Sequence, residues 1–286
     1  MTPLSLCLAL SLFFIPFFAN PSRAGDTALD LADSLLKIGN NNEAITEYKR
    51  FICFNPEDHR ISDAYYKIGL AYRRQKKWDD ALSALRKSLA MATDDSLRDE
   101  RRISIGIIFL VSQRYSAAEF DLLRVSSFSK NPYLQQKALF FLGICHLYTF
   151  HWAQAQKAFH QCFSPSEKIS QIDSLLTEAR HLKYKSPFLA KWLSTILPGM
   201  GQIYVGDWRN GLNALAINGL TSYLLLDALV ERRFQDALLS HLSLFERYYR
   251  GNRQRAEKMA RDHNEHLNRL WADRIIENLA ANNKRK

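Results

Sequence analysis

A pattern that returns every 37 residues is the strongest constraint on the fold of this 286-residue sequence. An apolar residue followed by a small one opens the pattern, at Leu31-Ala32, Ile68-Gly69, Ile105-Gly106 and Leu142-Gly143. A second small residue and, four positions later, a large one complete it, at Ala44 and Tyr48, Ala81 and Leu85, Ala118 and Leu122, and Ala155 and Phe159. Residues three or four apart share a helix face, so the spacing predicts two amphipathic helices per unit. We expect the small residues to make the closest helix contacts and the large residue to fill the gap beyond them.

Turn-forming residues punctuate the chain between these units, at Asn55-Pro56, Thr93-Asp94-Asp95, Asn131-Pro132 and Ser164-Pro165. Such residues end one helix and cap the next. The last of them belongs to Ser164-Pro165-Ser166-Glu167, which has the sequence of a capping box. A stripe of apolar residues follows, at Ile169, Ile172, Leu175, Leu176, Ala179 and Leu182. We expect this helix to cover the open end of the stack.

The layout resembles the tetratricopeptide repeat over roughly residues 25 to 165. Because the usual period is about 34 residues, each unit carries about three more, which we expect in the turn between units. The resemblance implies an all-α, helical-hairpin solenoid over residues 25–183, whose first helices line a concave surface for a protein or peptide. Matching the family position by position, the lining residues are Tyr66, Leu70, Arg73, Arg74, Ile103, Ile107, Leu110, Phe140, Ile144 and Leu147. Alternatively, the C-terminal helices of the same chain fill this surface.

The first 24 residues have the pattern of a secretory signal peptide. An apolar run from Leu4 to Phe18 precedes Ser22-Arg23-Ala24, which places small residues where a signal peptidase cleaves. The polar start contains no Lys or Arg, so an uncleaved N-terminal anchor remains the alternative. After cleavage three cysteines are left, Cys53, Cys145 and Cys162. Their odd number and spacing argue against a disulfide framework or a zinc site.

The stretch LPGMGQIYVGDWRNG, from Leu197 to Gly211, contains a Gly-x-Gly pair. A phosphate-binding loop needs a strand before its glycines and a helix after them. Here Ser186 and Pro187 are a predicted N-cap and first residue of a helix, so the pattern does not indicate a nucleotide site.

The segment Gly211 to Val230 has 20 residues without Lys, Arg or Pro, about the length that crosses a bilayer core. The preceding helix, Pro187 to Leu197, reaches only about 16 Å and cannot cross alone. We therefore expect a membrane-embedded turn between the two, formed by Pro198, Gly199, Gly201, Gln202 and Tyr204. Both glycines are expected to lie against the helix that carries Asn218. The two helices form a hairpin in the interpretation we favour, and Gly211–Val230 spans alone in the other.

Two short patterns carry a second resemblance. P-G-x-G-Q-x-Y starts at Pro198, and Y-x-G-N-x-x-x-A starts at Tyr249 and ends at Ala256. Together they resemble a two-helix membrane domain of bacterial repeat proteins of unknown function. The resemblance implies a membrane-associated helical domain over residues 186–250 and a location at a bacterial inner membrane, and it implies no activity. Residues 251–286 are predicted to form a basic helix and tail, whose charges either face solvent or contact anionic lipid.

The sequence contains no set of residues that points to catalysis. His263 and His266 lie three apart without a third metal ligand, and Ser34 to Lys37 matches S-x-x-K in a predicted packing helix. The net charge of +10 gathers mainly towards the C-terminus and does not by itself indicate nucleic-acid binding. We expect a non-enzymatic periplasmic scaffold without cofactor, metal or small-molecule substrate, which contacts a protein or peptide and membrane lipid. The alternative is a component of a membrane protein insertion or transport complex, in which Asn218 and Asp227 are the embedded polar residues.

Overall fold

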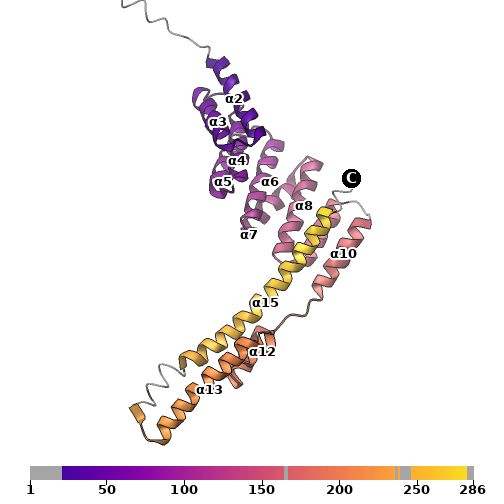
Figure 1. Cartoon of the computed structure of the whole chain (residues 1–286). Helices are drawn as coiled ribbons and strands as arrows, with labels where there is room; N and C mark the ends of the chain where they lie inside the picture. The colour runs from indigo at the N-terminus through magenta and orange to yellow at the C-terminus, as the bar shows by residue number, and fades with distance from the viewer. Residues whose placement is uncertain (1–20, 164–166, 236–237, 239–245, 282–286) are drawn as a thin grey trace, which may run out of the picture. The chain divides into compact units, whose positions relative to one another are not determined.

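The computed structural model describes residues 21–163, 167–235, 238 and 246–281. Within these ranges it contains helices and no strand, which confirms the all-α fold class (Figure 1). The helices are α2 (Pro21–Ile38), α3 (Asn41–Phe54), α4 (Ile61–Arg74), α5 (Trp78–Met91), α6 (Asp95–Val111), α7 (Tyr115–Phe128), α8 (Pro132–Tyr148), α9 (Trp152–Cys162), α10 (Glu167–Arg180), α11 (Pro187–Ile196), α12 (Met200–Val205), α13 (Trp208–Val230) and α15 (Glu246–Ala281). Residues 1–20 of the predicted signal segment and residues 164–166 of the predicted capping box lie outside the described residues.

Internal contacts divide the chain into two compact units. The described part of the first comprises residues 21–145 and 157–163, and that of the second comprises residues 146–156, 167–235, 238 and 246–281. The first unit therefore holds α2 to α7 and most of α8 and α9. The second holds α10 to α13, α15 and the residues that join α8 to α9.

The turn between the paired helices has the same geometry in every repeat. One residue in each turn has a positive φ: Gly39 at 87°, Lys76 at 59°, Gln113 at 61° and Phe150 at 62°. Its N–H donates to the carbonyl three residues earlier, and the next N–H donates to the carbonyl five residues before it. This is the hydrogen-bond pattern of a Schellman helix end. Its return at a step of 37 residues confirms the repeat period.

The repeat glycines occupy equivalent places, each beneath the large residue of the second helix. A Cβ added to Gly69, Gly106 or Gly143 would lie 2.7 Å from Leu85 Cγ, 2.8 Å from Leu122 Cγ or 2.5 Å from Phe159 Cε1. Beside Gly69 the added Cβ would also lie 3.4 Å from the Ala81 carbonyl oxygen, so the backbone at the small residue of the second helix is close as well. Helical side chains lean towards the N-terminus of their helix, so the large residue reaches back over the glycine.

The extra length of each repeat is not confined to the turn between units, where we expected it. Helices α6 and α8 each have 17 residues, against 14 in α4. Asp94 caps α6 by accepting a hydrogen bond from Leu97 N at 2.8 Å, and Asn131 accepts from Tyr133 N at 3.0 Å before α8. Because the caps lie early, residues that we expected in the turn belong to an additional turn of helix at the start of α6 and α8.

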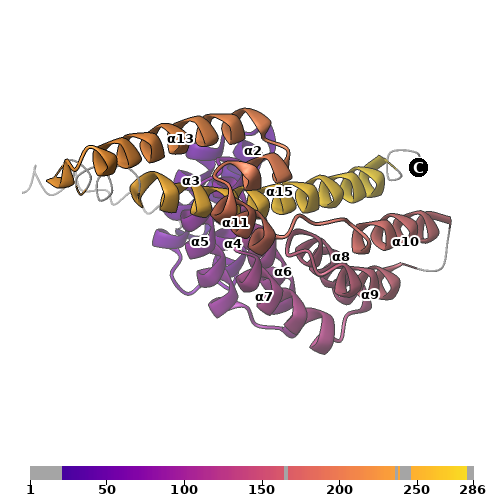
Figure 2. The same ribbon diagram turned by 90° about the horizontal axis from the view of Figure 1, so that it is seen from below.

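In the second unit α11 packs mainly against α15 rather than against α13. Helix α12 lies between these elements and contacts all three, while α13 and α15 run in opposite directions (Figures 1 and 2). In the hairpin that we favoured, Pro187–Tyr204 pairs with Gly211–Val230; of that segment α12 contacts α13, whereas α11 does not pack against it. The structure instead brings the C-terminal basic helix onto α11, where Ala190, Ala256 and Ala260 form a small buried cluster.

Helix α10 has the predicted apolar stripe, and Ile169, Ile172 and Leu176 are buried. It packs against α15 and against the start of α9, where Gln156 Nε2 donates to Asp173 Oδ1 at 2.7 Å.

Candidate functional site

The proposed lining of the repeat surface separates into accessible and buried residues. Arg74 is exposed, and the half-buried members are Tyr66, Leu70, Arg73, Ile107, Phe140 and Ile144. Ile103 and Leu147 are completely buried, and Leu110 is nearly so. Ile103 belongs to the hydrophobic core of the first unit. Neighbouring helices cover these side chains, so they stabilise the fold and are not available to a partner in this structure.

Contacts within the first unit also occupy part of the accessible set. The Tyr66 hydroxyl lies 3.3 Å from Ser104 Oγ, and the Arg101 guanidinium stacks 3.9 Å from the centre of the Tyr66 ring. Phe140 packs edge-on against Phe163, with ring centres 6.1 Å apart. Arg74 donates to the Leu36 carbonyl. The surface left for a partner is therefore smaller and more polar than the sequence predicted.

Arg101 is a buried arginine that no motif in the sequence indicates, with only 2% of its surface exposed. Its Nε donates to Ser88 Oγ at 3.1 Å, and its two terminal nitrogens contact Glu100 and Asp63. The contacts join three helices of the first unit. Only its place on the core-facing side of the predicted helix could have indicated burial, and charged residues are rarely buried unless they are paired.

A second polar cluster joins the first two repeats. Asp33 accepts hydrogen bonds from the Tyr48 hydroxyl at 2.5 Å and from Lys67 Nζ at 2.6 Å. Burial, together with the hydrogen bond and charge of Asp33, raises the pKa of Tyr48 far above its ordinary value. The phenol therefore remains protonated and serves as a donor.

The Gly-x-Gly pair is a tight helix junction. Gly199 has a φ of +102° and precedes α12, and a Cβ there would lie 2.1 Å from the Gly211 carbonyl oxygen. Gly199 thus lies against α13, the helix that carries Asn218. Gly201 does not, because a Cβ there would lie 2.0 Å from the Ala190 carbonyl oxygen of α11 and 2.8 Å from Ala256 Cβ of α15. Gly199 is the N-cap of α12 with a left-handed backbone, whereas Gly201 lies within the helix, and the two glycines face different neighbours.

A chain of buried hydrogen bonds starts at this junction. The Gly201 N–H donates to Ser194 Oγ at 3.1 Å, and the Ser194 hydroxyl donates to Gln202 Oε1 at 3.1 Å. Gln202 Nε2 then donates to Oδ1 and to the carbonyl oxygen of Asn252. Gln202 is almost completely buried, so this chain determines how its amide is oriented.

The two sequence patterns of the second resemblance meet in these contacts. Asn252 and Ala256 of the second pattern touch Gln202 and Gly201 of the first. The Tyr249 hydroxyl donates to the Thr195 carbonyl at 2.7 Å. The other residues of the predicted turn support the same junction. The Tyr204 hydroxyl accepts a hydrogen bond from Ser186 N at 3.1 Å, and Pro198 follows the end of α11.

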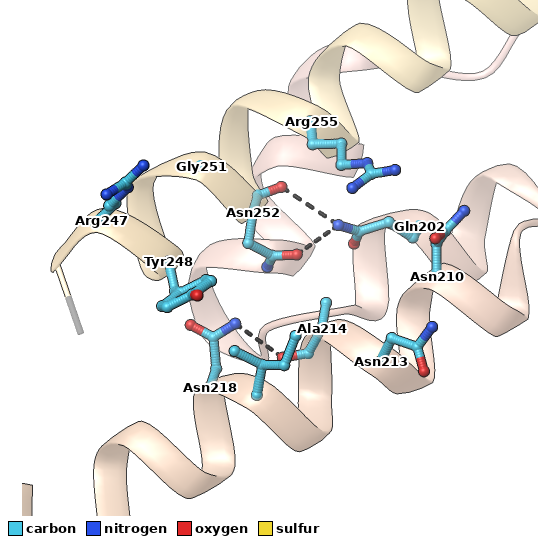
Figure 3. A pocket seen from close by; sticks show the side chains of 11 residues that line it. Gln202, Asn210, Asn213, Ala214, Asn218, Arg247, Tyr248, Gly251, Asn252 and Arg255 are labelled. Carbon is cyan, nitrogen blue, oxygen red and sulfur yellow. Dashed lines mark hydrogen bonds between the residues drawn. The ribbon is translucent and has the colours of Figure 1, made fainter. Parts of the chain in front are cut away.

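A pocket of about 340 Å³ lies beside this junction, between α12, α13 and α15. Figure 3 shows the amides of Asn218 and Asn252 facing the same space, with Tyr248 beside them. The lining residues are Gln202, Asn210, Asn213, Ala214, Ile217, Asn218, Arg247, Tyr248, Gly251, Asn252 and Arg255. Its floor is made of buried amides and its rim carries two exposed arginines. In the sequence Asn218 and Asn252 belong to separate patterns, and neither pattern predicts that they share a pocket.

The other surfaces of α11 and α13 are apolar and exposed. Helix α13 is the one helix in the described residues that is long and apolar enough to cross a membrane. Its exposed side chains include Leu220 at 59%, Leu226 at 61% and Val230 at 81%. On α11, the large exposed side chains are Phe188, Leu189, Trp192 and Ile196. Soluble monomeric proteins rarely expose an apolar surface of this kind.

The described residues contain no group of three metal-ligating side chains and no disulfide bond. Cys145 is buried, and this burial raises the pKa of its thiol to about 12. A thiol with such a pKa is not a reactive nucleophile at neutral pH.

Comparisons with known proteins identify the repeats. The family model described as Tetratricopeptide repeat matches twice, over residues 29–96 and 66–132. No curated protein matches the chain. A solved structure described as "Functional Characterization of Pseudomonas Aeruginosa pilF" is similar to 82% of this chain and 97% of its own, with 19% sequence identity and a TM-score of 0.41. The chain therefore carries tetratricopeptide repeats over residues 29–132.

Proposed function

We propose that this chain is a non-enzymatic scaffold, anchored at a membrane through α11 to α13, that binds a protein or peptide partner through its repeats. The match of residues 29–132 to tetratricopeptide repeats supports the interaction role. Exposed Arg74 with half-buried Leu70, Arg73 and Ile107 offers a mixed apolar and basic surface. That chemistry suits a partner segment with apolar side chains and an acidic end.

The observation that carries the membrane anchor is the exposure of apolar side chains all along α13. The helix has 23 residues, and at 1.5 Å per residue it is about 35 Å long, close to the thickness of a bilayer core. Leu220, Leu226 and Val230 would each lose unfavourable contact with water in lipid. The neighbouring exposed side chains of α11, such as Trp192, extend the same apolar surface.

The predicted signal segment supports export of the repeats. Together with the resemblance of residues 186–265 to a bacterial membrane domain, it leads us to place the repeats in the periplasm and the anchor at the inner membrane.

Vesicle flotation tests the anchor. The full chain should float with liposomes, and replacing Leu220, Leu224 and Leu226 by Ser should reduce the floating fraction by about tenfold or more, because three buried leucines are lost from lipid. Leu31, an exposed apolar residue of the repeats, provides the control. If Leu31→Ser lowers flotation as much as the triple variant, or if the parent does not float, the anchor is rejected.

Site-specific photo-crosslinking tests the repeat surface. A photoreactive residue at Ile107 should give a discrete protein adduct in cells, whereas one at exposed Ser83 on α5 should not. Arg73→Glu combined with Arg74→Glu should weaken the adduct without unfolding the repeats. If the photoreactive residue at Ser83 gives as much adduct as the one at Ile107, binding through this surface is contradicted. The same holds if the charge reversal leaves the adduct yield unchanged.

A further inference from the structure

The pocket between α12, α13 and α15 contains two polar atoms without a hydrogen-bond partner among the described residues. They are Asn218 Oδ1 and Asn252 Nδ2. Asn218 is 3% exposed and Asn252 is 6% exposed, and both line the pocket. Unpaired buried polar groups are rare because burying them without a partner costs free energy. An acceptor and a donor that face one cavity therefore indicate a ligand.

The surrounding hydrogen bonds fix what each amide presents. Asn218 Nδ2 donates to the Ala214 carbonyl at 2.8 Å, so Oδ1 is left for the pocket. Asn252 Oδ1 accepts from Gln202 Nε2, whose orientation is set in turn by the Ser194 hydroxyl. Asn252 Nδ2 is thus left for the pocket as well. A matching ligand supplies a hydrogen-bond donor to Asn218 and an acceptor to Asn252.

The rim of the pocket is positively charged and favours a negatively charged ligand. Arg247 and Arg255 line it, and neither guanidinium has an ion-pair partner among the residues that the structure describes. The nearby carboxylate, Asp207, interacts with the charge of Arg255, but its hydrogen bonds cap α13, where it accepts from Asn210 N at 3.1 Å and from Asn210 Nδ2 at 2.6 Å. Arginine is the side chain best suited to phosphate oxygens, because its planar fork donates to two of them at once.

The wall formed by α13 continues from this polar pocket onto apolar surface. Ile217 lines the pocket and is exposed, and Leu220 and Leu224 follow it on the same helix. A ligand held by its polar group between the arginines can lay a hydrocarbon chain along these residues. The pocket volume of about 340 Å³ lies at the small end of the range for ligand sites, which suits a headgroup and not a whole lipid.

We propose that this pocket binds the phosphodiester headgroup of an anionic glycerophospholipid that also carries a hydroxyl, as phosphatidylglycerol does. Arg247 and Arg255 bind the phosphate, Asn252 Nδ2 donates to an ester or phosphate oxygen, and Asn218 Oδ1 accepts from the headgroup hydroxyl. The choice of lipid over a soluble phosphate ester rests on the proposed membrane anchor. The anion site itself does not, because it follows from the amides and arginines.

Calorimetric titration of the purified full chain in a non-ionic detergent tests the proposal with four probes. These are short-chain phosphatidylglycerol, short-chain phosphatidylmethanol, glycerol 1-phosphate and inorganic phosphate. Phosphatidylmethanol has the same charge and phosphodiester but lacks the hydroxyl. We expect phosphatidylglycerol to bind most tightly, and Asn218→Leu to abolish its preference over phosphatidylmethanol.

Charge-matched variants separate the pocket from the general basic surface. Arg247→Gln and Arg255→Gln should each weaken phosphatidylglycerol binding by about tenfold. Arg250→Gln and Arg261→Gln remove the same charge from exposed positions on the same helix, where each arginine pairs with a glutamate, and should change binding less than twofold. Circular dichroism confirms that each variant keeps its helices.

Each other outcome overturns a stated part of the proposal. Equal weakening by the control arginines, or no binding of any probe, rejects the pocket. Equal affinity for glycerol 1-phosphate and the short-chain lipid assigns the site to a soluble phosphate ester and rejects the lipid. Failure of vesicle flotation rejects the membrane anchor and is read separately, because the titration uses no bilayer.

Discussion

Gly201 lies in direct contact with Ala256, fifty-five positions further along the chain: a Cβ added to Gly201 would come within 2.8 Å of Ala256 Cβ. The same atom would lie 2.0 Å from the Ala190 carbonyl oxygen, which is backbone and cannot rotate away. The contact joins α12 to α11 and α15. Glycine is the one residue that leaves room for it.

We therefore expect Gly201→Ala to loosen α15 by roughly 1–3 kcal/mol through overpacking. Hydrogen exchange of peptides from residues 246–281 measures this local stability. Gly219→Ala is the matched control, since a Cβ there meets nothing within 4 Å, and it should leave α15 unchanged. Equal protection of α15 in Gly201→Ala and the parent contradicts the tight junction.

Gly106 and Leu122 provide the corresponding test in the repeats. Gly106→Ala should destabilise the repeats by roughly 1–3 kcal/mol because its Cβ meets Leu122 Cγ, and Leu122→Ala should cost roughly 2–5 kcal/mol by leaving a cavity. In the double variant the new methyl group occupies space that the leucine left. The combined loss measured by urea unfolding should therefore be smaller than the sum of the single losses. Strict additivity is the contrary result.

Replacing Arg101 by Lys should destabilise the first unit by roughly 1–3 kcal/mol. Lysine has one nitrogen where arginine donates from three, so it cannot serve Ser88, Glu100 and Asp63 together. It also loses the planar stacking on Tyr66. Urea unfolding measures the loss, and Arg98→Lys, at an exposed position on the same helix, is the comparison. A similar small effect at both positions argues against a structural role for Arg101.

The pH dependence of stability should include a contribution from Asp58. Hydrogen bonds from Arg60, above all from its guanidinium, lower the pKa of Asp58 to about 2 from an ordinary value of 3.8. The folded state therefore holds the carboxylate more strongly than the unfolded state does. This stabilisation is complete above about pH 4 and is lost as the pH falls towards 2. Arg60 is partly exposed, so solvent screening limits the contribution to about 1 kcal/mol.

Urea unfolding at several pH values measures the contribution of Asp58 to the free energy of unfolding. Asp58→Asn should flatten the loss of stability between about pH 4 and pH 2. Asp80→Asn, at an exposed site on α5, should lose the same stability as the parent over this pH range. If Asp58→Asn loses as much stability between about pH 4 and pH 2 as the parent does, Asp58 does not make this contribution.

The regular part of the fold was predictable because a strict period assigns every residue to a helix face. Gly69, Gly106 and Gly143 had to be equivalent once the step of 37 residues was found. The burial of Ile103 and Leu147 was not predictable in this way. Family positions say which way a residue points, whereas burial depends on the side chains of the neighbouring helices.

The pocket could not be predicted from the sequence, for a different reason. Its residues come from α12, α13 and α15, and no local pattern says that α15 returns to α11 and α12. The short patterns around Gln202 and Asn252 were visible as separate motifs. Only their hydrogen bond reveals that one completes the other.

The hydrogen bond from Gln202 to Asn252 also affects the order in which the chain can acquire structure during its synthesis. Each repeat closes on contacts between neighbours in the sequence and can form as it emerges. Gln202 can form its hydrogen bond only after Asn252, fifty positions later, has been translated. Until then α15 does not cover the Gln202 amide or Gly201. A nascent chain that pauses before α15 therefore exposes an unfinished junction, and α15 is the segment that completes the second unit.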